Sequence, residues 1–251
     1  MKTHSKAVED IFQFRHFAVR DENAAMKVGT DSVLLGSFCR PAQAKTILDV
    51  GTGTGILALM LAQKSDAIID AVELDKDACI DALENFRRSE WLSKLNLRTM
   101  PLKDFQGKNY DIIISNPPYF QTHSNVVIRD SARRKARHEE ELTLENLCTE
   151  VNKRLAVDGA FWVIIPFSEK DRLKRAIELE GMNVNEEIHI RPKPSKPMNR
   201  IILKIGKLEQ NFQQHSFTIY TDDGKPTEEY MSLTKEYYLW KGLDDDPRLK
   251  I

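Results

Sequence analysis

The sequence predicts an α/β fold in which helices cover both faces of a mostly parallel sheet. Three observations support this. Short runs rich in β-branched and aliphatic residues alternate with helical patterns along most of the chain, which is typical of parallel strands joined by helical crossovers. A glycine-rich segment follows the first run and opens a helix. The last two runs are joined by Arg191–Arg200, which is too short for a helical crossover, so that pair should form an antiparallel hairpin.

Seven strands are expected, and helices fill most of the connections between them. The strands are Thr46–Val50, Ile68–Leu74, Leu95–Met100, Asp111–Asn116, Gly159–Pro166, Val184–Ile190 and Ile201–Lys207. The first two helices are Ile56–Gln63 and one with Ala78, Ala82 and Phe86 at four-residue spacing. The third runs from a Thr143 cap to Asp158 and Gly159. The fourth starts at a Ser168–Asp171 capping box and stops at Gly181. Asp75 and Asp77 should cap and charge the second helix.

The length of 251 residues suits a single domain with three parts. Residues 1–45 should form an N-terminal lid and helix, and residues 46–207 the core. Residues 208–251 should add a strand, Phe217–Thr221, and a short helix around Thr227–Leu239.

The composition points to an ordinary globular protein, with 41% hydrophobic and 30% charged residues. No apolar run approaches the roughly 20 residues of a membrane span, and the start MKTHSKAVED lacks the apolar core of a signal peptide, so we expect a cytoplasmic protein without a membrane partner. Cys39, Cys79 and Cys148 have no zinc-site spacing, so we expect reduced, buried thiols and no metal. The net charge of -1 leaves any polyanion to be bound by local basic patches.

The segment LDVGTGTGILALMLA carries three glycines at alternate positions, Gly51, Gly53 and Gly55. Glycine lets a backbone turn tightly and approach a ligand where a Cβ would collide. A dinucleotide fingerprint would need its third glycine at position 56, which is Ile56. The spacing, preceded by Asp49, instead fits S-adenosylmethionine, because the Asp49 carboxylate can help to hold the cationic methionine end.

Glu73, with Leu74 beside it, lies 22 positions after Gly51 at the end of the expected second strand. An acidic side chain there can bind both hydroxyls of a ribose. Residues 101–104 should pass beside the adenine ring, and Asp104 is a candidate partner for its amino group. With the order of strands and helices, these positions predict a doubly wound, Rossmann-like class I methyltransferase that uses S-adenosylmethionine.

The segment SNPPYF, residues 115–120, ends the fourth expected strand with two prolines. Taken alone, it could equally be a rigid exit from the sheet. Beside a cofactor loop, the Asn116 side-chain oxygen and the Pro117 carbonyl are placed to accept the hydrogens of an adenine amino group and localise its lone pair for methylation. Pro118 would stiffen this corner, and Tyr119, with Phe120 behind it, can stack on a base taken out of its helix or loop.

These motifs resemble the class I amino-methyltransferases that share N-P-P-[YFW]. More closely, the chain resembles the bacterial family that methylates N6 of adenine 37 in tRNA1(Val). The resemblance covers most of the chain and rests on MKVGTDSVLLGSF (26–38), LDVGTGTGILALMLA, SNPPYF, ARHEEELTLENL (136–147) and LTKEYYL (233–239) in this order. Related enzymes commonly have an acidic residue near position 101, where this chain has Pro101 and its nearest acidic residue is Asp104.

The resemblance implies tRNA as substrate and a lid over the cofactor formed by Lys27, Gly29, Thr30 and Asp31. The lid stretch also fits a helix start, with Thr30 or Asp31 capping an apolar face. For RNA phosphates we expect a patch of Arg129, Arg133, Arg134, Lys135 and Arg137, and a second one at Lys193, Lys196 and Arg200. His138 is expected to pack or cap rather than catalyse.

Three alternatives stay open from the sequence. A guanine N2 of ribosomal RNA and a glutamine amide of a protein are also planar amines that N-P-P-Y could hold. A protein that binds the cofactor without turnover is the third, although it would have little need of a rigid, donor-poor corner at a strand end. We expect a monomer.

Overall fold

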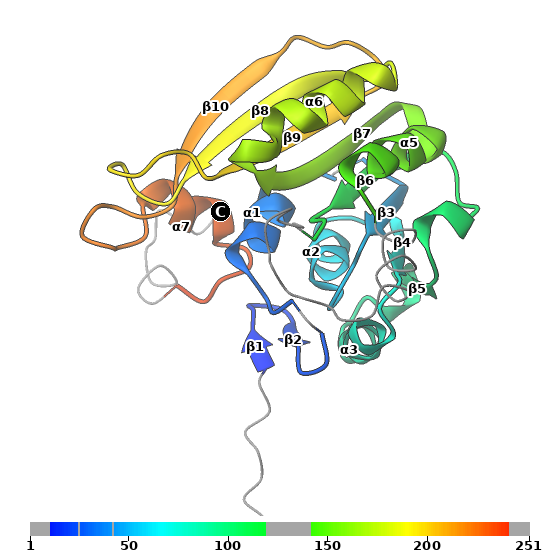
Figure 1. Cartoon of the computed structure of the whole chain (residues 1–251). Helices are drawn as coiled ribbons and strands as arrows, with labels where there is room; N and C mark the ends of the chain where they lie inside the picture. The colour runs from blue at the N-terminus through cyan, green and yellow to red at the C-terminus, as the bar shows by residue number, and fades with distance from the viewer. Residues whose placement is uncertain (1–10, 25, 42, 119–141, 241–251) are drawn as a thin grey trace, which may run out of the picture.

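The computed structural model describes residues 11–24, 26–41, 43–118 and 142–240. Its centre is a sheet of eight strands in the order β10-β8-β9-β7-β6-β3-β4-β5 (Figure 1). The strands are β3 (Thr46–Val50), β4 (Ile68–Glu73), β5 (Leu95–Thr99), β6 (Tyr110–Ser115), β7 (Leu155–Pro166), β8 (Asn183–Arg191), β9 (Arg200–Gly206) and β10 (Gln213–Thr218).

All seven predicted strands form, and the predicted hairpin is confirmed. Strand β9 runs antiparallel to both β7 and β8, whereas every other neighbouring pair in this sheet is parallel. The appended strand joins the same sheet as β10, parallel to β8, and it starts at Gln213 rather than at Phe217. The sheet therefore has eight strands instead of seven.

Helices cover both faces of this sheet (Figure 1). On one face lie α1 (Thr30–Phe38), α2 (Ile56–Lys64) and α3 (Lys76–Arg88), and α7 (Glu228–Thr234) lies beside α1. On the other face lie α5 (Leu144–Arg154) and α6 (Lys170–Leu179). Successive residues of the central strands enter opposite cores: Ile47 packs in the first and Leu48 in the second. Central strands buried on both faces are typical of parallel sheets.

Most helix ends follow the sequence. Asp75 caps α3 by accepting from the Asp77 amide at 3.0 Å, and Thr143 caps α5 by accepting from the Asn146 amide at 3.1 Å. Gly181, with φ of 67°, follows the last turn of α6 as expected.

The predicted starts of α6 and β7 are wrong. The Ser168–Asp171 capping box is absent, because a 3-10 turn, η3 (Phe167–Glu169), contains Ser168 and leaves Glu169 at the cap position of α6 without a side-chain bond. Strand β7 begins at Leu155 rather than at Gly159, because Leu155 already pairs with Tyr110 of β6 ahead of a register shift.

The N-terminal part contains an element that was not predicted from the sequence. Strands β1 (Ile11–Gln13) and β2 (Ala18–Arg20) form a separate antiparallel pair before α1. Two further 3-10 turns, η1 (Leu92–Lys94) and η2 (Leu102–Asp104), flank β5. Helix α7 is shorter than expected and ends at Thr234. All three cysteines are buried and free, as predicted.

Candidate functional site

Three parallel strands bring predicted site residues to one edge of the sheet. Val50 of β3 is paired with Val72 of β4 on one side and with Ser115 of β6 on the other. The next residue of each strand is Gly51, Glu73 or Asn116, so these three lie side by side, with about 5 Å between neighbouring backbones. The carboxyl edge of a parallel sheet is where doubly wound folds bind their ligands.

The loop from β3 to α2 is a tight turn built on glycine. Gly51, Gly53 and Gly55 have φ values of 68°, 56° and 82°, which glycine adopts without strain. A Cβ on Gly55 would collide with the Phe86 ring, so packing alone accounts for that glycine. At Gly51 and Gly53 the direction of a Cβ is open, which leaves room for a ligand against the backbone.

Asp49 is fully buried beneath this loop. Its Oδ2 accepts from the Thr52 hydroxyl at 2.5 Å and from the Ala58 amide at 3.1 Å, whereas its buried Oδ1 has no hydrogen-bond partner. Burial raises the pKa of the Asp49 carboxyl to about 7, against the lowering effect of those two bonds. An unsatisfied buried carboxylate oxygen is costly, and a ligand that brings a cation here would compensate that cost.

Glu73 is held by backbone amides on both sides of the site. Its Oε2 accepts from Gly53 at 2.9 Å, and its Oε1 accepts from Leu74 and Asp75 at 2.7 and 2.8 Å. The carboxylate therefore connects the end of β4 to the glycine loop and is fixed in orientation. Leu74 itself is exposed.

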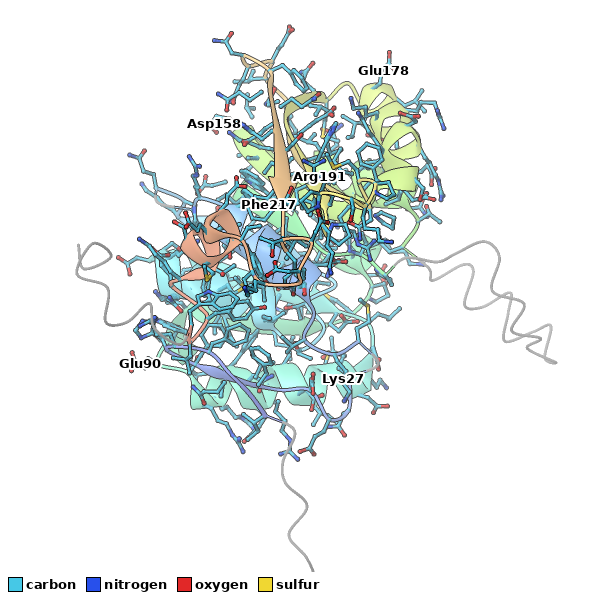
Figure 2. All side chains as sticks on the ribbon, turned by 90° about the vertical axis from the view of Figure 1, so that its left-hand side faces the viewer. Lys27, Glu90, Asp158, Glu178, Arg191 and Phe217 are labelled. Atoms are coloured by element: carbon cyan, nitrogen blue, oxygen red, sulfur yellow. The ribbon has the colours of Figure 1, made fainter. Side chains whose placement is uncertain are left out.

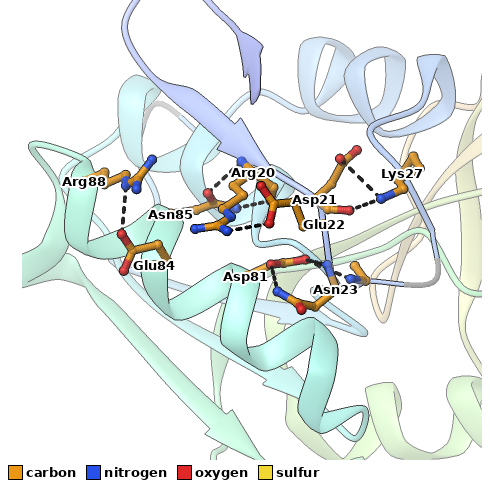
Figure 3. Close-up of polar contacts among 10 residues, drawn as sticks. Arg20, Asp21, Glu22, Asn23, Lys27, Asp81, Glu84, Asn85 and Arg88 are labelled. Atoms are coloured by element: carbon orange, nitrogen blue, oxygen red, sulfur yellow. Dashed lines mark hydrogen bonds and ion pairs between the residues drawn. The ribbon is translucent and has the colours of Figure 1, made fainter. Parts of the chain in front are cut away.

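The stretch between β2 and α1 is fixed to α3 (Figure 3), and α3 also binds the glycine loop. Asp81 of α3 accepts from the backbone amide and the side chain of Asn23, at 2.8 and 2.7 Å. Asn85, one turn further along α3, donates to the carbonyls of Arg20 and Thr54, at 2.8 and 2.9 Å. Two buried side chains of α3 thus set where the predicted lid lies.

The four predicted lid residues surround the start of α1. Lys27 lies 3.6 Å from the Asp21 carboxylate and is more than half exposed. Gly29 is extended and occupies the cap position of α1 without a side-chain bond. The prediction that Thr30 or Asp31 caps this helix is therefore wrong, because both already lie in its first turn.

The first turn of α1 joins two other segments of the site edge. Asp31 Oδ2 accepts from Arg200 Nε at 2.7 Å, where β9 begins. Ser32, nearly buried, accepts from Asn116 Nδ2 at 2.9 Å. Ser32 was not identified from the sequence, and Arg200 was assigned only to a phosphate patch. Neither position stands in a pattern that would have indicated these contacts.

The corner after β6 is described as far as Pro118. The Ser115 hydroxyl donates to the Val50 carbonyl at 2.9 Å and so ties the end of β6 to β3. The bond to Ser32 directs Asn116 Nδ2 at α1, and the acceptor Oδ1 lies on the other branch of the amide. Tyr119 and Phe120 lie outside the described residues.

The other predicted residues lie in loops and turns after the strands or outside the described residues. Asp104 ends the η2 turn after edge strand β5 and is exposed. Lys193 and Lys196 lie in the loop between β8 and β9, where Lys193 Nζ donates to the Asp222 carbonyl at 3.3 Å. The predicted patch at Arg129, Arg133, Arg134, Lys135 and Arg137 lies outside the described residues, as does His138.

The described ranges contain neither a cluster of metal ligands nor a membrane-spanning helix. There, no three or more His, Cys, Asp or Glu side chains gather in a way that could hold a metal ion. None of the helices in those ranges has both the length and the apolar character needed to cross a bilayer.

Comparison with known proteins gives a consistent result. Residues 24–180 match the family model described as "Methyltransferase small domain". The chain is 36% identical to the tRNA1(Val) (adenine(37)-N6)-methyltransferase of Parabacteroides distasonis, over 91% of this chain and 97% of that protein.

Two solved structures share the fold. A predicted O-methyltransferase from Agrobacterium tumefaciens superposes with a TM-score of 0.66 at 14% identity, covering 82% of this chain and 96% of the other. M. jannaschii TYW2 in complex with AdoMet superposes with a TM-score of 0.57 at 15% identity, covering 82% and 90%.

Proposed function

The chain belongs to the tRNA1(Val) (adenine(37)-N6)-methyltransferase family, and from this premise we propose that it transfers a methyl group from S-adenosylmethionine to N6 of adenine 37 in tRNA1(Val). The observation that carries the proposal is the alignment of Gly51, Glu73 and Asn116 at one level of the sheet edge. A methyl donor held by the first two would lie next to an amide suited to orient an amino group. We also propose that the protein meets this substrate in the cytoplasm and acts as a monomer.

The residues present fit the cofactor. The open backbone at Gly51 and Gly53 gives room for it, and the unpartnered Asp49 Oδ1 suits its cationic amino group. The fixed Glu73 carboxylate suits the ribose hydroxyls. Lys27, Gly29, Thr30 and Asp31 would cover the site from the anchored N-terminal stretch, and Leu74 and Asp104 would border its base.

The catalytic step needs an amino group whose lone pair points at the methyl donor. S-adenosylmethionine supplies an electrophilic methyl group on a sulfonium. Asn116 Oδ1 and the Pro117 carbonyl would accept hydrogen bonds from the two amino hydrogens. These hydrogen bonds would draw the nitrogen lone pair out of conjugation with the ring. Pro117 and Pro118 have fixed φ and no N–H, so no neighbouring donor competes for the amine. Nitrogen loses its proton after the bond to carbon forms, when it has become acidic, so no dedicated base is required.

The direct test is to map the methylated nucleotide. Digested tRNA from cells with and without this protein should differ, by mass spectrometry, at N6-methyladenosine in position 37 of tRNA1(Val). Purified protein with labelled cofactor should label tRNA and neither ribosomes nor protein extract. Label in ribosomes or protein would favour a guanine N2 or a glutamine amide instead, and label in none of them would favour a binding protein without turnover.

Cofactor affinity should rise with pH around neutrality. Burial raises the pKa of the Asp49 carboxyl to about 7, so this group is mainly protonated at pH 6 and mainly anionic at pH 8. Only the anion attracts the cationic amino group, and an α-amino group itself loses its proton near pH 8. The Kd for S-adenosylmethionine from calorimetry should therefore fall about fivefold between pH 6 and pH 7, where the amino group is still charged. Asp49→Asn should bind more weakly and lose this part of the pH dependence. An equal slope in both proteins would contradict the assignment.

Lys193 and Lys196 should contribute to RNA affinity through phosphates. Reversing both to glutamate should weaken tRNA binding about tenfold at low salt and reduce the slope of log Kd against log salt by about one for each phosphate that is no longer bound. Lys207→Glu, at the opposite end of β9, is the matched control. Arg133→Glu and Arg134→Glu test the other predicted patch in the same assay. A double variant with the control's affinity and slope would remove the two lysines from the binding surface.

A further inference from the structure

An open cavity lies on the other side of the first turn of α1 from the proposed site. Its volume is about 340 Å³, and its walls include Phe12, Tyr220, Tyr230, Tyr238 and Trp240, with Thr30 at one side. These residues come from four separate segments: β1, α1, the turn after β10, and α7 with the residues that follow it. The volume lies in the range of about 300–1,000 Å³ that is usual for small-molecule sites.

The aromatic side chains of this cavity brace one another. The Trp240 ring lies 5.6 Å from Tyr230 and 5.3 Å from Tyr238, in nearly perpendicular arrangements. Trp240 Nε1 also donates to the Thr234 hydroxyl at 3.0 Å. Tyr220 packs against Tyr230 at 5.9 Å. Such edge-to-face contacts hold rings in place without filling the space between them.

The cavity is adjacent to the catalytic corner through α1. Thr30, which lines it, is two positions before Ser32, which binds Asn116 at 2.9 Å. Two positions in a helix are about 5–6 Å apart. A ligand in the cavity and a base held at Asn116 would therefore lie on either side of the same helical turn.

The cavity also borders the basic loop between β8 and β9. The Tyr220 amide donates to the Pro192 carbonyl at 2.9 Å, directly before Lys193. Arg191 and Phe217 mark the ends of β8 and β10 at this corner (Figure 2). The nearby carboxylates are engaged locally: Asp222 accepts from Ser195, and Asp223 from Lys225. Lysines next to an aromatic cavity form the combination that binds single-stranded RNA, because the cations hold phosphates while rings stack on bases.

We propose that this cavity, lined by Phe12, Tyr220, Tyr230, Tyr238 and Trp240, binds an unstacked nucleobase of the RNA substrate, a neighbour of the base that is methylated. This inference rests on the proposed function and deepens it, because it names the contact that holds the RNA single strand open. The occupant is a base and not an apolar peptide, because the cavity lies between the proposed amine-binding corner and the proposed phosphate-binding loop.

The test uses two wall residues that are not fully buried. Phe12 is 40% exposed and Tyr220 is partly exposed, so Phe12→Ala and Tyr220→Ala should fold. Phe212→Ala is the control, because Phe212 is 54% exposed and precedes β10 at its far end, about 20 Å from the cavity. Phe12→Ala and Tyr220→Ala should each raise the KM for tRNA at least about fivefold, as the removal of one stacked ring implies, whereas Phe212→Ala should keep the wild-type KM. The Kd for S-adenosylmethionine should be unchanged in all three variants. Thermal denaturation checks that each variant is folded.

Photo-crosslinking gives a readout that does not depend on turnover. An anticodon stem-loop RNA carrying 4-thiouridine at single positions around the target should crosslink to Phe12, Tyr220 or Trp240, as mapped by mass spectrometry. The inference would be overturned if the active wild type crosslinked elsewhere and the cavity variants matched Phe212→Ala. Wild type that methylates no tRNA would overturn the proposed function instead.

Discussion

Asn116→Ala is expected to lower kcat on tRNA by about 10²–10³-fold and to leave the Kd for S-adenosylmethionine within about threefold of wild type. Loss of one preorganised hydrogen-bonding group has effects of this size where it acts on developing charge. Asn116 is at the level of Gly51. Its Nδ2 donates to Ser32 of α1, and its Oδ1, on the other branch of the amide, is the acceptor proposed for the reacting amine. Its removal should therefore affect the reacting amine more than the cofactor.

Ser32→Ala is the matched control for this experiment. It removes the partner of Asn116 Nδ2 and keeps the acceptor oxygen, so kcat should fall by no more than about tenfold, the effect of one net hydrogen bond. Single-turnover kinetics and calorimetry on the three proteins separate the methyl transfer from binding. If Asn116→Ala lost cofactor affinity in proportion to kcat, the residue would belong to the cofactor pocket. If Ser32→Ala matched Asn116→Ala, the orientation of the amide would be the whole of its contribution.

The seven strands from β3 to β9 could be predicted in their order along the chain, because each one is marked by the residues within it or next to it. The β3 and β6 strands are short aliphatic runs, and Gly55 and Asp75 stand at helix starts where turn and cap chemistry requires them. The β1–β2 pair was missed because strands of three residues give too little alternation to detect. The start of β7 was misplaced because Gly159 indicates a break, whereas the pairing of Leu155 with Tyr110 extends the strand.

The residues of the candidate site could likewise be predicted only in part. Glycine spacing and strand ends placed Gly51, Glu73 and Asn116 at one edge, since parallel strands in register carry their next residues to the same level. Contacts across long separations could not be predicted from spacing. Ser32 and Asn116 are 84 positions apart, and Asp31 and Arg200 are 169 apart. The aromatic cavity could not be predicted for the same reason, because its walls come from both ends of the chain.

Glu73→Ala should have the reverse profile to Asn116→Ala, with cofactor binding lost first. The Glu73 carboxylate accepts from the amides of Gly53, Leu74 and Asp75, so its removal takes away the proposed ribose ligand and also releases the glycine loop. A hydrogen bond to a charged group is worth about 1.5–3 kcal/mol, so the loss of even one ribose contact corresponds to a Kd for S-adenosylmethionine raised about 10- to 100-fold, and the loss of both to more. At saturating cofactor, kcat should recover to within about tenfold of wild type.

Two further variants separate the roles of Glu73 and test the role of Asp104 in binding the cofactor's adenine. Glu73→Gln keeps one acceptor oxygen but turns an amino group toward backbone N–H donors, so its Kd should lie between those of wild type and Glu73→Ala. Asp104→Ala should change the Kd less than about threefold, because Asp104 is exposed at the end of the η2 turn beyond β5. A Kd for Glu73→Ala equal to wild type would exclude the ribose assignment. A loss at Asp104 as large as at Glu73 would place the adenine ring against η2, which would then supply the acidic partner that Pro101 does not.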